Sequence, residues 1–403
     1  MLTGRDIVVF TYSDWLASWS TPQQIATRLA PANRVLFVDV PRPLLYGLKK
    51  SDPQGAGQWV GEPLQEVRPN FYVYHPPHIF LPFTGMPFVA MKVVLDFNGR
   101  ALTKLLKKVL GQLGFAHPIV WNFSPLHGMA VERLDRCFTL YDICDEWANY
   151  LHSDSGRKLV AWIEERLCRG ADLVFVGTDN AKPSRDPFNP EVHVVHHAAD
   201  YGHFSKAALP ETPVPDDMRE IPRPVIGSVG VMDPARFDAE LILRLAKQRP
   251  DWSLVLVGPP RADMDLGPLE GIANIHLMGN RAITELPAYL KAFDVAIIPY
   301  MVNEATRDIY PLKLQEYLAT GKPVVSAALP ALLPYGDVVS IAESHRDFEA
   351  KIAQAIQDDT PEARETRQEV ARRNSWEQRV EEKSAHVVRL LDGVSENEGG
   401  HES

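Results

Sequence analysis

The feature that most constrains the fold is an alternation of short apolar runs with amphipathic stretches, which occurs twice along the 403 residues. Short β-branched runs are typical of strands buried on both faces, and apolar residues every three or four positions are typical of helices. The first set predicts strands at residues 6–10, 34–39, 119–123, 140–143 and 171–177, and helices at residues 21–29 and 156–169. The second set predicts strands at residues 225–229, 253–257, 275–278, 295–298 and 323–326, and a helix at residues 239–248. Such alternation predicts parallel sheets covered by helices on both faces.

The domain organisation follows from a proline-rich break between the two sets. Residues 206–224 contain five prolines and predict an interdomain linker. We therefore expect an α/β protein with two doubly wound, Rossmann-like domains facing a cleft, at residues 1–205 and 225–375. A last helix is expected at residues 376–391. The Gly- and Glu-rich tail, residues 392–403, is expected to be disordered.

Composition narrows the class of protein. Apolar residues make up 45% of the chain, which is typical of a globular protein, and the net charge of −10 argues against a nucleic-acid partner. The three cysteines lack C-x-x-C spacing, and we find neither a signal-peptide layout nor an apolar run that could span a bilayer. We expect a cytoplasmic protein, with a peripheral position at the inner face of the cytoplasmic membrane as a further expectation.

The strongest chemical signal is a pair of acids, Asp308 and Glu316, separated by a turn and a helix start. The turn contains Pro311 and Leu312, and the helix is expected to begin at Lys313. Main-chain N–H groups at a helix start suit a diphosphate, and carboxylates accept hydrogen bonds from sugar hydroxyls. The unit therefore indicates a nucleotide-sugar site. The alternative is that both acids and the lysine are solvated charges of an ordinary helix.

The run P-L-K-L-Q-E-Y-L-A-T-G-K-P-V-V at residues 311–325 resembles the family four retaining glycosyltransferases of the GT-B fold, in their bacterial polysaccharide and teichuronic-acid-type members. The resemblance implies that Asp308, where the family usually has Glu, contacts the donor sugar and that Glu316 contacts the ribose. It also implies that Pro311, Leu312 and Lys313 meet the phosphates.

The same resemblance extends to a glycine-containing turn in the second domain. It implies that Gly230 forms the turn and that Arg236 contacts phosphate. Val231 stands where the family has an arginine, which removes one phosphate contact. The alternative for Arg236 is a surface ion pair with Asp233 or Asp238.

Two further second-domain features follow from the resemblance. Gly279 and Arg281 are implied to lie against the nucleotide base. The last helix, residues 376–391, is implied to cross back to the first domain.

The first domain resembles the family more loosely. His127 is the candidate for a histidine that approaches the donor sugar, and its alternative is a surface-loop histidine. Trp19, Asp142, Asp145 and Glu146 are acceptor-side candidates. The three acids also fit a catalytic cluster, because close carboxylates raise one another's pKa, or residues that only fix a loop.

Two other patterns suggest a metal site but are interpreted otherwise. Asp263 and Asp265 form a D-x-D in a polar loop, and residues 192–200 read V-H-V-V-H-H-A-A-D. The first is expected to be solvated, and the second is expected to end the first domain. We expect neither a metal nor a cofactor, with Lys313, Arg236 and the helix-start N–H groups stabilising the leaving diphosphate.

Residues 76–113 combine an apolar loop with a basic amphipathic helix. This combination is typical of a segment that contacts a membrane surface. The alternative is a core helix with a solvated basic face.

We therefore expect a glycosyltransferase of the hexosyltransferase type that moves a sugar from a nucleotide-sugar donor to a surface-polysaccharide or lipid-linked glycan acceptor, with retention and without a metal. One alternative is a non-catalytic nucleotide-sugar-binding or scaffold subunit of a polysaccharide assembly complex. Another is a nucleotide-sugar epimerase on the same fold.

Overall fold

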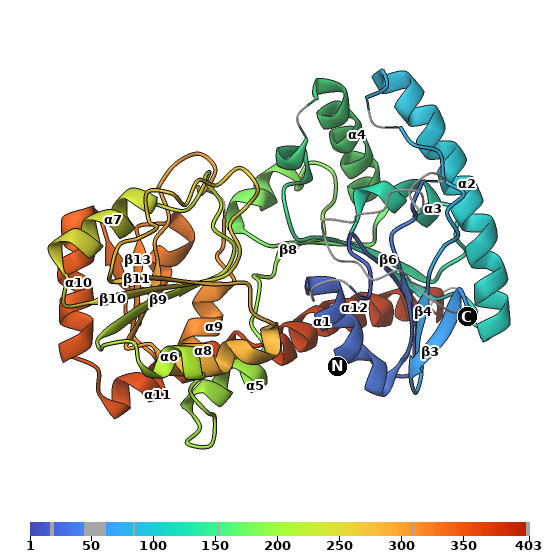
Figure 1. Cartoon of the computed structure of the whole chain (residues 1–403). Coiled ribbons are helices and arrows are strands. Elements are labelled where there is room, and N and C mark those ends of the chain that lie inside the picture. The colour runs from blue at the N-terminus through green and yellow to red at the C-terminus, as the bar shows by residue number, and fades with distance from the viewer. Residues whose placement is uncertain (17–19, 44–61, 84, 152, 308, 400–403) are drawn as a thin grey trace. The chain divides into compact units, whose positions relative to one another are not determined.

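The computed structural model describes residues 1–16, 20–43, 62–83, 85–151, 153–307 and 309–399. The chain forms two compact units. The first consists of residues 1–196 and 379–403, and the second consists of residues 197–378. Each unit is built on one sheet with helices packed against it (Figure 1).

The sheet of the first unit has the strand order β3-β4-β2-β1-β5-β6-β7-β8. Its strands are β1 Asp6–Phe10, β2 Arg34–Val38, β3 Leu64–Arg68, β4 Phe71–Tyr74, β5 Ile119–Asn122, β6 Phe138–Ile143, β7 Leu173–Val176 and β8 Val192–Val194. Among the described strands every pairing is parallel except that of β3 with β4. The strand order reverses at β1, which has β2 on one side and β5 on the other.

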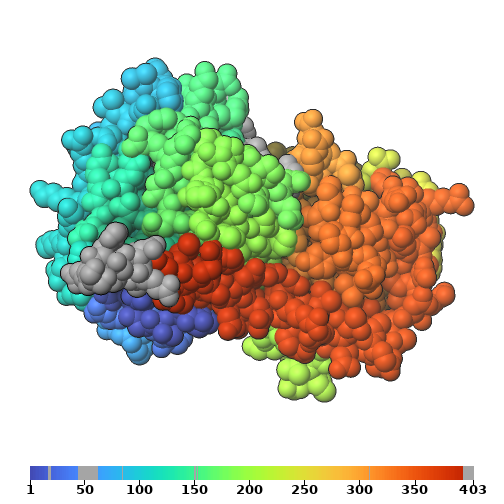
Figure 2. All heavy atoms as spheres, turned by 180° about the vertical axis from the view of Figure 1, so that it is seen from behind, coloured from blue at the N-terminus to red at the C-terminus, as the bar shows by residue number. Residues whose placement is uncertain are grey.

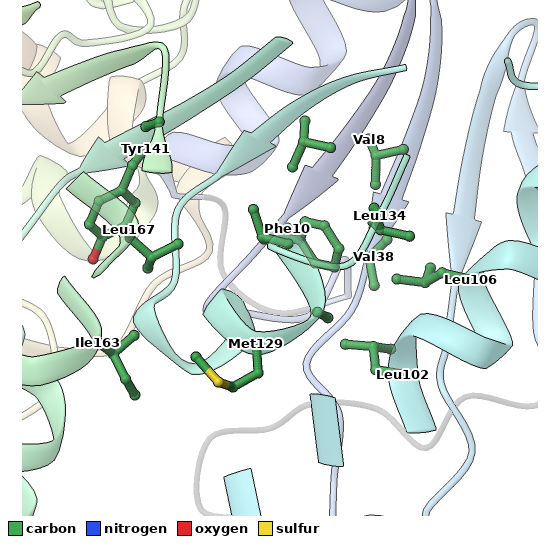
Figure 3. Close-up of a cluster of buried hydrophobic side chains, with 14 of the residues drawn as sticks. Val8, Phe10, Val38, Leu102, Leu106, Met129, Leu134, Tyr141, Ile163 and Leu167 are labelled. Carbon is green, nitrogen blue, oxygen red and sulfur yellow. The ribbon is translucent and has the colours of Figure 1, made fainter. Parts of the chain in front are cut away.

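Helices cover both faces of this first sheet. They are α1 Thr21–Leu29, α2 Phe88–Leu113, α3 Gly128–Val131, α4 Asp154–Gly170 and most of α12 Trp376–Gly399. Successive side chains of a strand point to opposite faces. Tyr141 and Ile143 of β6 therefore join the apolar cluster formed with α2, α3 and α4, part of which is drawn in Figure 3. Asp142 points the other way, to Lys383 of α12.

The second unit contains a six-stranded sheet with the order β11-β10-β9-β12-β13-β14. Its strands are β9 Val225–Val229, β10 Ser253–Val257, β11 Ile275–Gly279, β12 Val295–Ile298, β13 Val324–Ala327 and β14 Ser340–Ala342. All the described pairings in this sheet are parallel. Read along the chain, this is the strand order of a dinucleotide-binding fold, with the reversal between β9 and β12.

The helices of the second unit are α5 Tyr201–Phe204, α6 Asp216–Arg219, α7 Ala239–Gln248, α8 Leu286–Ala292, α9 Lys313–Ala319, α10 His345–Gln357 and α11 Pro361–Arg373. Alternation along β10 again divides the core. Leu254 and Leu256 pack with α7 and α10, whereas Val255 and Val257 pack with the residues of α8, α9 and α11. The predicted α/β class with two doubly wound, Rossmann-like sheets is confirmed.

The units divide at different residues from those predicted. The first stretch of the first unit ends at His196, and residues 197–205 belong to the second unit. The predicted linker, residues 206–224, lies wholly within the second unit, where Ala207 and Met218 are buried. Lys291 of α8 donates to the carbonyl oxygen of Pro210 over 2.9 Å. The prolines thus prevent long regular elements in this segment without preventing its packing.

The predicted disordered tail, residues 392–403, begins too early. Helix α12 starts at Trp376 and continues to Gly399, and from Arg379 onward it belongs to the first unit. Figure 2 shows this part of α12, in red, at the molecular surface. Val380 and Val387 of this helix are buried in the described part, and composition at the end of the chain does not show that contribution.

Candidate functional site

The candidate site lies in the second unit, at the carboxyl ends of β9 and β10 beside the start of α9. Ser228, Gly230, Val231, Phe237 and Lys313 line a narrow pocket there. This place is next to the reversal of strand order between β9 and β12, where open parallel sheets bind their ligands.

Three glycines let the loops after β9, β10 and β11 pack directly on one another. Gly230 and Gly258 have φ angles of +126° and +139°. A Cβ on Gly258 would lie 2.2 Å from the carbonyl oxygen of Gly230. The N–H of Gly258 donates to the carbonyl oxygen of Gly279 over 2.8 Å. Only glycine fits at position 258. Gly258 contacts both Gly230 and Gly279, which were predicted as site residues, whereas Gly258 itself was not.

Lys313 places its ammonium group against the backbone of Gly230. A Cβ on Gly230 would lie 3.1 Å from Lys313 Nζ, and the same Nζ lies 4.8 Å from the ring centre of Tyr300. Burial lowers the pKa of Lys313, but the nearby hydroxyls of Tyr317 and Tyr300 raise it more, so that it exceeds its ordinary value. Lys313 is therefore a partly buried cation at the pocket, which favours the phosphate role over a solvated helix lysine.

Glu316 lies one turn along α9 from Lys313. Burial raises the pKa of its carboxyl to about 7, and Lys313 opposes this shift. Within the described ranges, the carboxylate has no hydrogen-bond or ion-pair partner. A partly buried carboxylate without a donor is costly, and ligand hydroxyls would supply donors.

The turn before α9 leaves main-chain donors open. The first helical bond runs from the N–H of Leu314 to the carbonyl oxygen of Pro311 over 3.0 Å. The N–H groups of Leu312 and Lys313 have no acceptor among the residues that the structure describes, as is usual at a helix start. Asp308, the first acid of the predicted motif, lies outside the described residues.

Arg236 forms an ion pair with Asp233, which was one of the two acids named in the alternative to a phosphate contact. Its guanidinium contacts Asp233 over 2.9 Å, and Arg261 contacts the same carboxylate over 3.1 Å. Although burial raises the pKa of Asp233, hydrogen bonds from the Ala235 N–H and from Arg236 outweigh it, so the pKa falls below its ordinary value. Asp238 is not part of this pair and instead contacts His345 over 2.8 Å.

Arg281 is bound within the second unit. It contacts Asp217 of α6 over 2.8 Å and the hydroxyl of Tyr289 of α8. Gly279, two residues earlier, ends β11 with a φ of +66°, and a Cβ on it would meet no described atom within 4 Å. Arg281 therefore fixes the loop that follows β11, and no described atom fills the space beside Gly279.

In the first unit His127 is buried, so its interpretation as a surface-loop residue is wrong. It ends the 3₁₀ turn Pro125–His127, and its ring packs on Phe10 with 5.2 Å between ring centres. Neither ring nitrogen has a hydrogen-bond partner among the described residues, and burial lowers the pKa of His127 to about 3. The ring is thus neutral, and both of its nitrogens are buried.

The three first-unit acids, for which a catalytic cluster was one alternative, have different surroundings. Asp142 is buried and accepts from Lys383 over 2.5 Å and from Trp121 over 3.0 Å. Glu146 contacts Arg185 over 2.8 Å, whereas Asp145 is exposed. Alternation along β6 turns Asp142 toward α12, away from the loop that follows. Asp142 therefore has a structural partner in α12, and its acceptor-side role stays a prediction. Trp19 lies outside the described residues.

The two patterns that suggested metal ligands have other partners. Asp263 contacts Arg261 over 3.2 Å, and Asp265 accepts from the N–H of Gly267 over 2.9 Å. His193 contacts Glu191 over 2.9 Å. In the part of the chain that the structure describes, no three His, Cys, Asp or Glu side chains gather as metal ligands would.

Sequence reasoning missed two aromatic residues of the site. Tyr300 follows β12 and faces Lys313. The hydroxyl of Tyr317 accepts from the N–H of Val229 over 2.7 Å, which ties α9 to the end of β9. The sequence held one signal for each of them: Tyr300 follows a predicted strand, and Tyr317 is the neighbour of Glu316.

Part of the chain matches a known protein family. Residues 223–358 match the family described as glycosyl transferases group 1. The putative teichuronic acid biosynthesis glycosyltransferase TuaH of Bacillus subtilis is 29% identical over 255 residues, which cover 59% of this chain and 63% of TuaH. The match thus spans less than two thirds of that relative.

Solved structures share the fold over nearly the whole chain. Sucrose-phosphate synthase from Thermosynechococcus elongatus has a TM-score of 0.66 and 15% identity, covering 97% of this chain and all of that one. HepE of Anabaena, in complex with UDP and glucose, has a TM-score of 0.60 and 14% identity, covering 96% of this chain and all of that one. The chain therefore has the GT-B fold, and its residues 223–358 match the model of the group 1 glycosyltransferases.

Proposed function

We propose that the protein transfers a glycosyl group from a nucleotide-sugar donor to a glycan acceptor. The observation that carries the proposal is the pairing of Lys313 and Glu316 on one helix turn, against the Gly230 backbone, within a group 1 glycosyltransferase domain. The cation and the carboxylate are suited to different parts of one ligand.

The diphosphate is proposed to lie against Lys313. An ammonium group fixed beside Gly230 attracts anionic oxygens, and the N–H groups of Leu312 and Lys313 add donors. These groups would stabilise the negative charge that develops on the leaving nucleoside diphosphate. A bound metal is not needed in this scheme.

The hydroxyls of the nucleotide-sugar are proposed to donate hydrogen bonds to the carboxylates of Glu316 and Asp308. Glu316 is assigned to the ribose because its carboxylate has no protein donor among the described residues, and vicinal hydroxyls supply two. Asp308 is assigned to the donor sugar, and this assignment follows from its place in the motif alone. His127 is the first-unit candidate for a sugar contact, since a neutral ring can both donate and accept.

The acceptor is proposed to be a surface polysaccharide or its lipid-linked precursor, with transfer at the inner face of the cytoplasmic membrane. This rests on the similarity to TuaH, whose name assigns it to teichuronic acid biosynthesis. Retention of the anomeric configuration is proposed on the same family grounds.

The test is turnover with labelled UDP-, GDP-, ADP- and dTDP-sugars, with and without a lipid-linked glycan extract from a bacterial membrane. We expect nucleoside diphosphate release from one donor, dependent on the extract and unchanged in excess EDTA. Loss in EDTA that Mn²⁺ restores would contradict the metal-free scheme. Conversion of the donor without an acceptor would favour the epimerase, and binding without turnover would favour the scaffold subunit.

A further inference from the structure

Helix α2 presents an apolar face to solvent in addition to the one that it buries. Its buried face packs into the core of the first unit through Met91, Leu95, Leu102, Leu106, Val109 and Leu110. On the opposite side Val89, Val93 and Phe97 are 70%, 65% and 54% exposed. A spacing of four residues places these three side chains in one stripe along the helix. A single exposed apolar residue is ordinary, but three on successive turns are not.

A loop extends this stripe. Ile79 and Leu81 are also exposed, at 46% and 42%. The main chain of Leu81 is bound to the side chain of Asn98 in both directions over 2.9 Å, so the loop lies against α2 next to Phe97. We call Ile79, Leu81, Val89, Val93 and Phe97 the apolar patch.

The second half of α2 continues on the same side with cations. Arg100, Lys104, Lys107 and Lys108 are exposed, and the steps from Phe97 to Arg100, Lys104 and Lys108 are three or four residues each. Helix α2 has five basic residues and one acidic residue, although the whole chain has a net charge of −10. Arg100 contacts Asp96 over 2.9 Å, whereas Lys104, Lys107 and Lys108 have no acidic partner among the residues that the structure describes. The three lysines of this basic stripe are therefore available to an anionic partner.

The remaining lysine of α2, Lys92, differs from these three because it has a partner within the first unit. Lys92 lies over the ring of Trp162 of α4, 4.1 Å from its centre, and so is used within the unit. None of the helices that the structure describes is both long and apolar enough to cross a bilayer. The features of α2 are thus those of a helix that lies on a surface.

We propose that α2 docks the first unit onto an anionic phospholipid bilayer. The apolar patch enters the boundary between headgroups and acyl chains, and the basic stripe contacts the anionic headgroups. With a rise of about 1.5 Å per residue, Val89 and Phe97 are about 12 Å apart and Lys108 lies about 17 Å beyond Phe97. The helix therefore lies inclined, with its N-terminal half deeper. A protein partner or a second copy would fit the apolar patch, but the uncompensated cations favour a lipid surface.

The docking surface is independent of the proposed transfer reaction. None of its residues belongs to the site around Lys313 and Glu316, so donor binding and vesicle binding can be measured separately. A failure of vesicle binding would remove the membrane location from the proposed function and leave the donor site standing, whereas a failure of donor binding would leave the docking surface standing.

The test is co-sedimentation of the full-length protein with vesicles of phosphatidylcholine alone or mixed with phosphatidylglycerol. We expect binding to the mixed vesicles only. The variant Val89→Ser/Val93→Ser/Phe97→Ser is expected to bind at least about tenfold more weakly, because it removes the side chains that enter the bilayer. The variant Lys104→Gln/Lys107→Gln/Lys108→Gln is expected to lose roughly a hundredfold at low salt, since each lysine is attracted to the anionic surface.

Matched controls separate docking from general surface effects. Leu333→Ser removes an exposed apolar residue of the second unit, and Lys206→Gln/Lys247→Gln/Arg346→Gln removes the same charge from exposed positions there. Both controls should bind the vesicles like the unmodified protein, and every variant should keep its thermal unfolding midpoint. Binding of the unmodified protein to phosphatidylcholine alone, no vesicle binding, or unchanged binding by either α2 variant would overturn the proposal. The proposal would also be overturned if sedimentation velocity showed a dimer of the unmodified protein that became monomeric only in the Val89→Ser/Val93→Ser/Phe97→Ser variant.

Discussion

At the residue scale, Glu316 links the chemistry of the site to the stability of the fold. Its pKa is raised to about 7 from an ordinary value of 4.5 because burial disfavours the charged form. As pH rises, the unfolded chain loses this proton before the folded protein does. The folded state therefore loses stability between about pH 4.5 and 7, and the loss is complete above that range.

Glu316→Gln is expected to remove this penalty. We predict that the variant without ligand is more stable than the unmodified protein at pH 8 by about 1–3 kcal/mol, and that most of this gain disappears at pH 5. Thermal unfolding of both proteins at the two pH values measures it. Equal unfolding midpoints at pH 8 would mean that water or an unseen donor already compensates the carboxylate.

His127 provides a second test at this scale. Two buried ring nitrogens without partners among the described residues are costly, so His127→Leu is expected to leave the unfolding midpoint unchanged or higher. If the ring contacts the donor sugar, turnover should fall about tenfold or more. Unchanged turnover in a stably folded variant would assign His127 to the core alone.

At the scale of elements, α12 is fixed to the first sheet by a buried ion pair. Lys383 and Asp142 are 4% and 3% exposed and lie 2.5 Å apart. Lys383→Met is expected to destabilise the first unit by about 3–5 kcal/mol, because it leaves a buried carboxylate unpaired. The double variant Asp142→Asn/Lys383→Met should recover most of this loss while keeping the acceptor for Trp121.

Chemical denaturation of the three proteins, followed by fluorescence, measures this coupling. If the single variant unfolds like the unmodified protein, the pair does not hold α12. If the double variant keeps its stability but loses turnover, the acceptor-side role of Asp142 would be supported.

The elements differ in how far the sequence could predict them. Strands buried on both faces, such as β9 and β10, were predicted at their observed residues because their apolar runs are continuous. The β3–β4 hairpin was missed, since β3 alternates partly buried and exposed positions and carries charges. Residues 206–224 were misread because proline content reports on backbone regularity and not on packing.

The site shows a similar division. Lys313 and Glu316 could be predicted because they belong to one continuous run. The contact of Gly258 with Gly230 could not, because it depends on the order of strands in the sheet. The ion pair of Asp142 could not be predicted for a related reason: its partner, Lys383, is 241 residues away in the chain.

At the scale of the whole molecule, both units have a doubly wound sheet, but different residues lie at the point where the strand order reverses. Each sheet reverses its strand order beside its first parallel strand, β1 in the first unit and β9 in the second. The second unit places glycines, a lysine and a carboxylate at that reversal, where we propose that the nucleotide-sugar binds. The first unit adds α2, whose outward side has no counterpart among the described helices of the second unit in its combination of apolar and basic stripes.

The account depends most directly on whether the start of α9 binds a nucleotide-sugar. Calorimetric titration of the purified protein with UDP-, GDP-, ADP- and dTDP-sugars measures this, alongside Glu316→Ala, Lys313→Met and the exposed control Lys247→Met. We predict that one donor binds the unmodified protein and the control equally, and binds each site variant about tenfold to a hundredfold more weakly. Equal affinity in all four proteins, or no binding of any donor, would contradict the account.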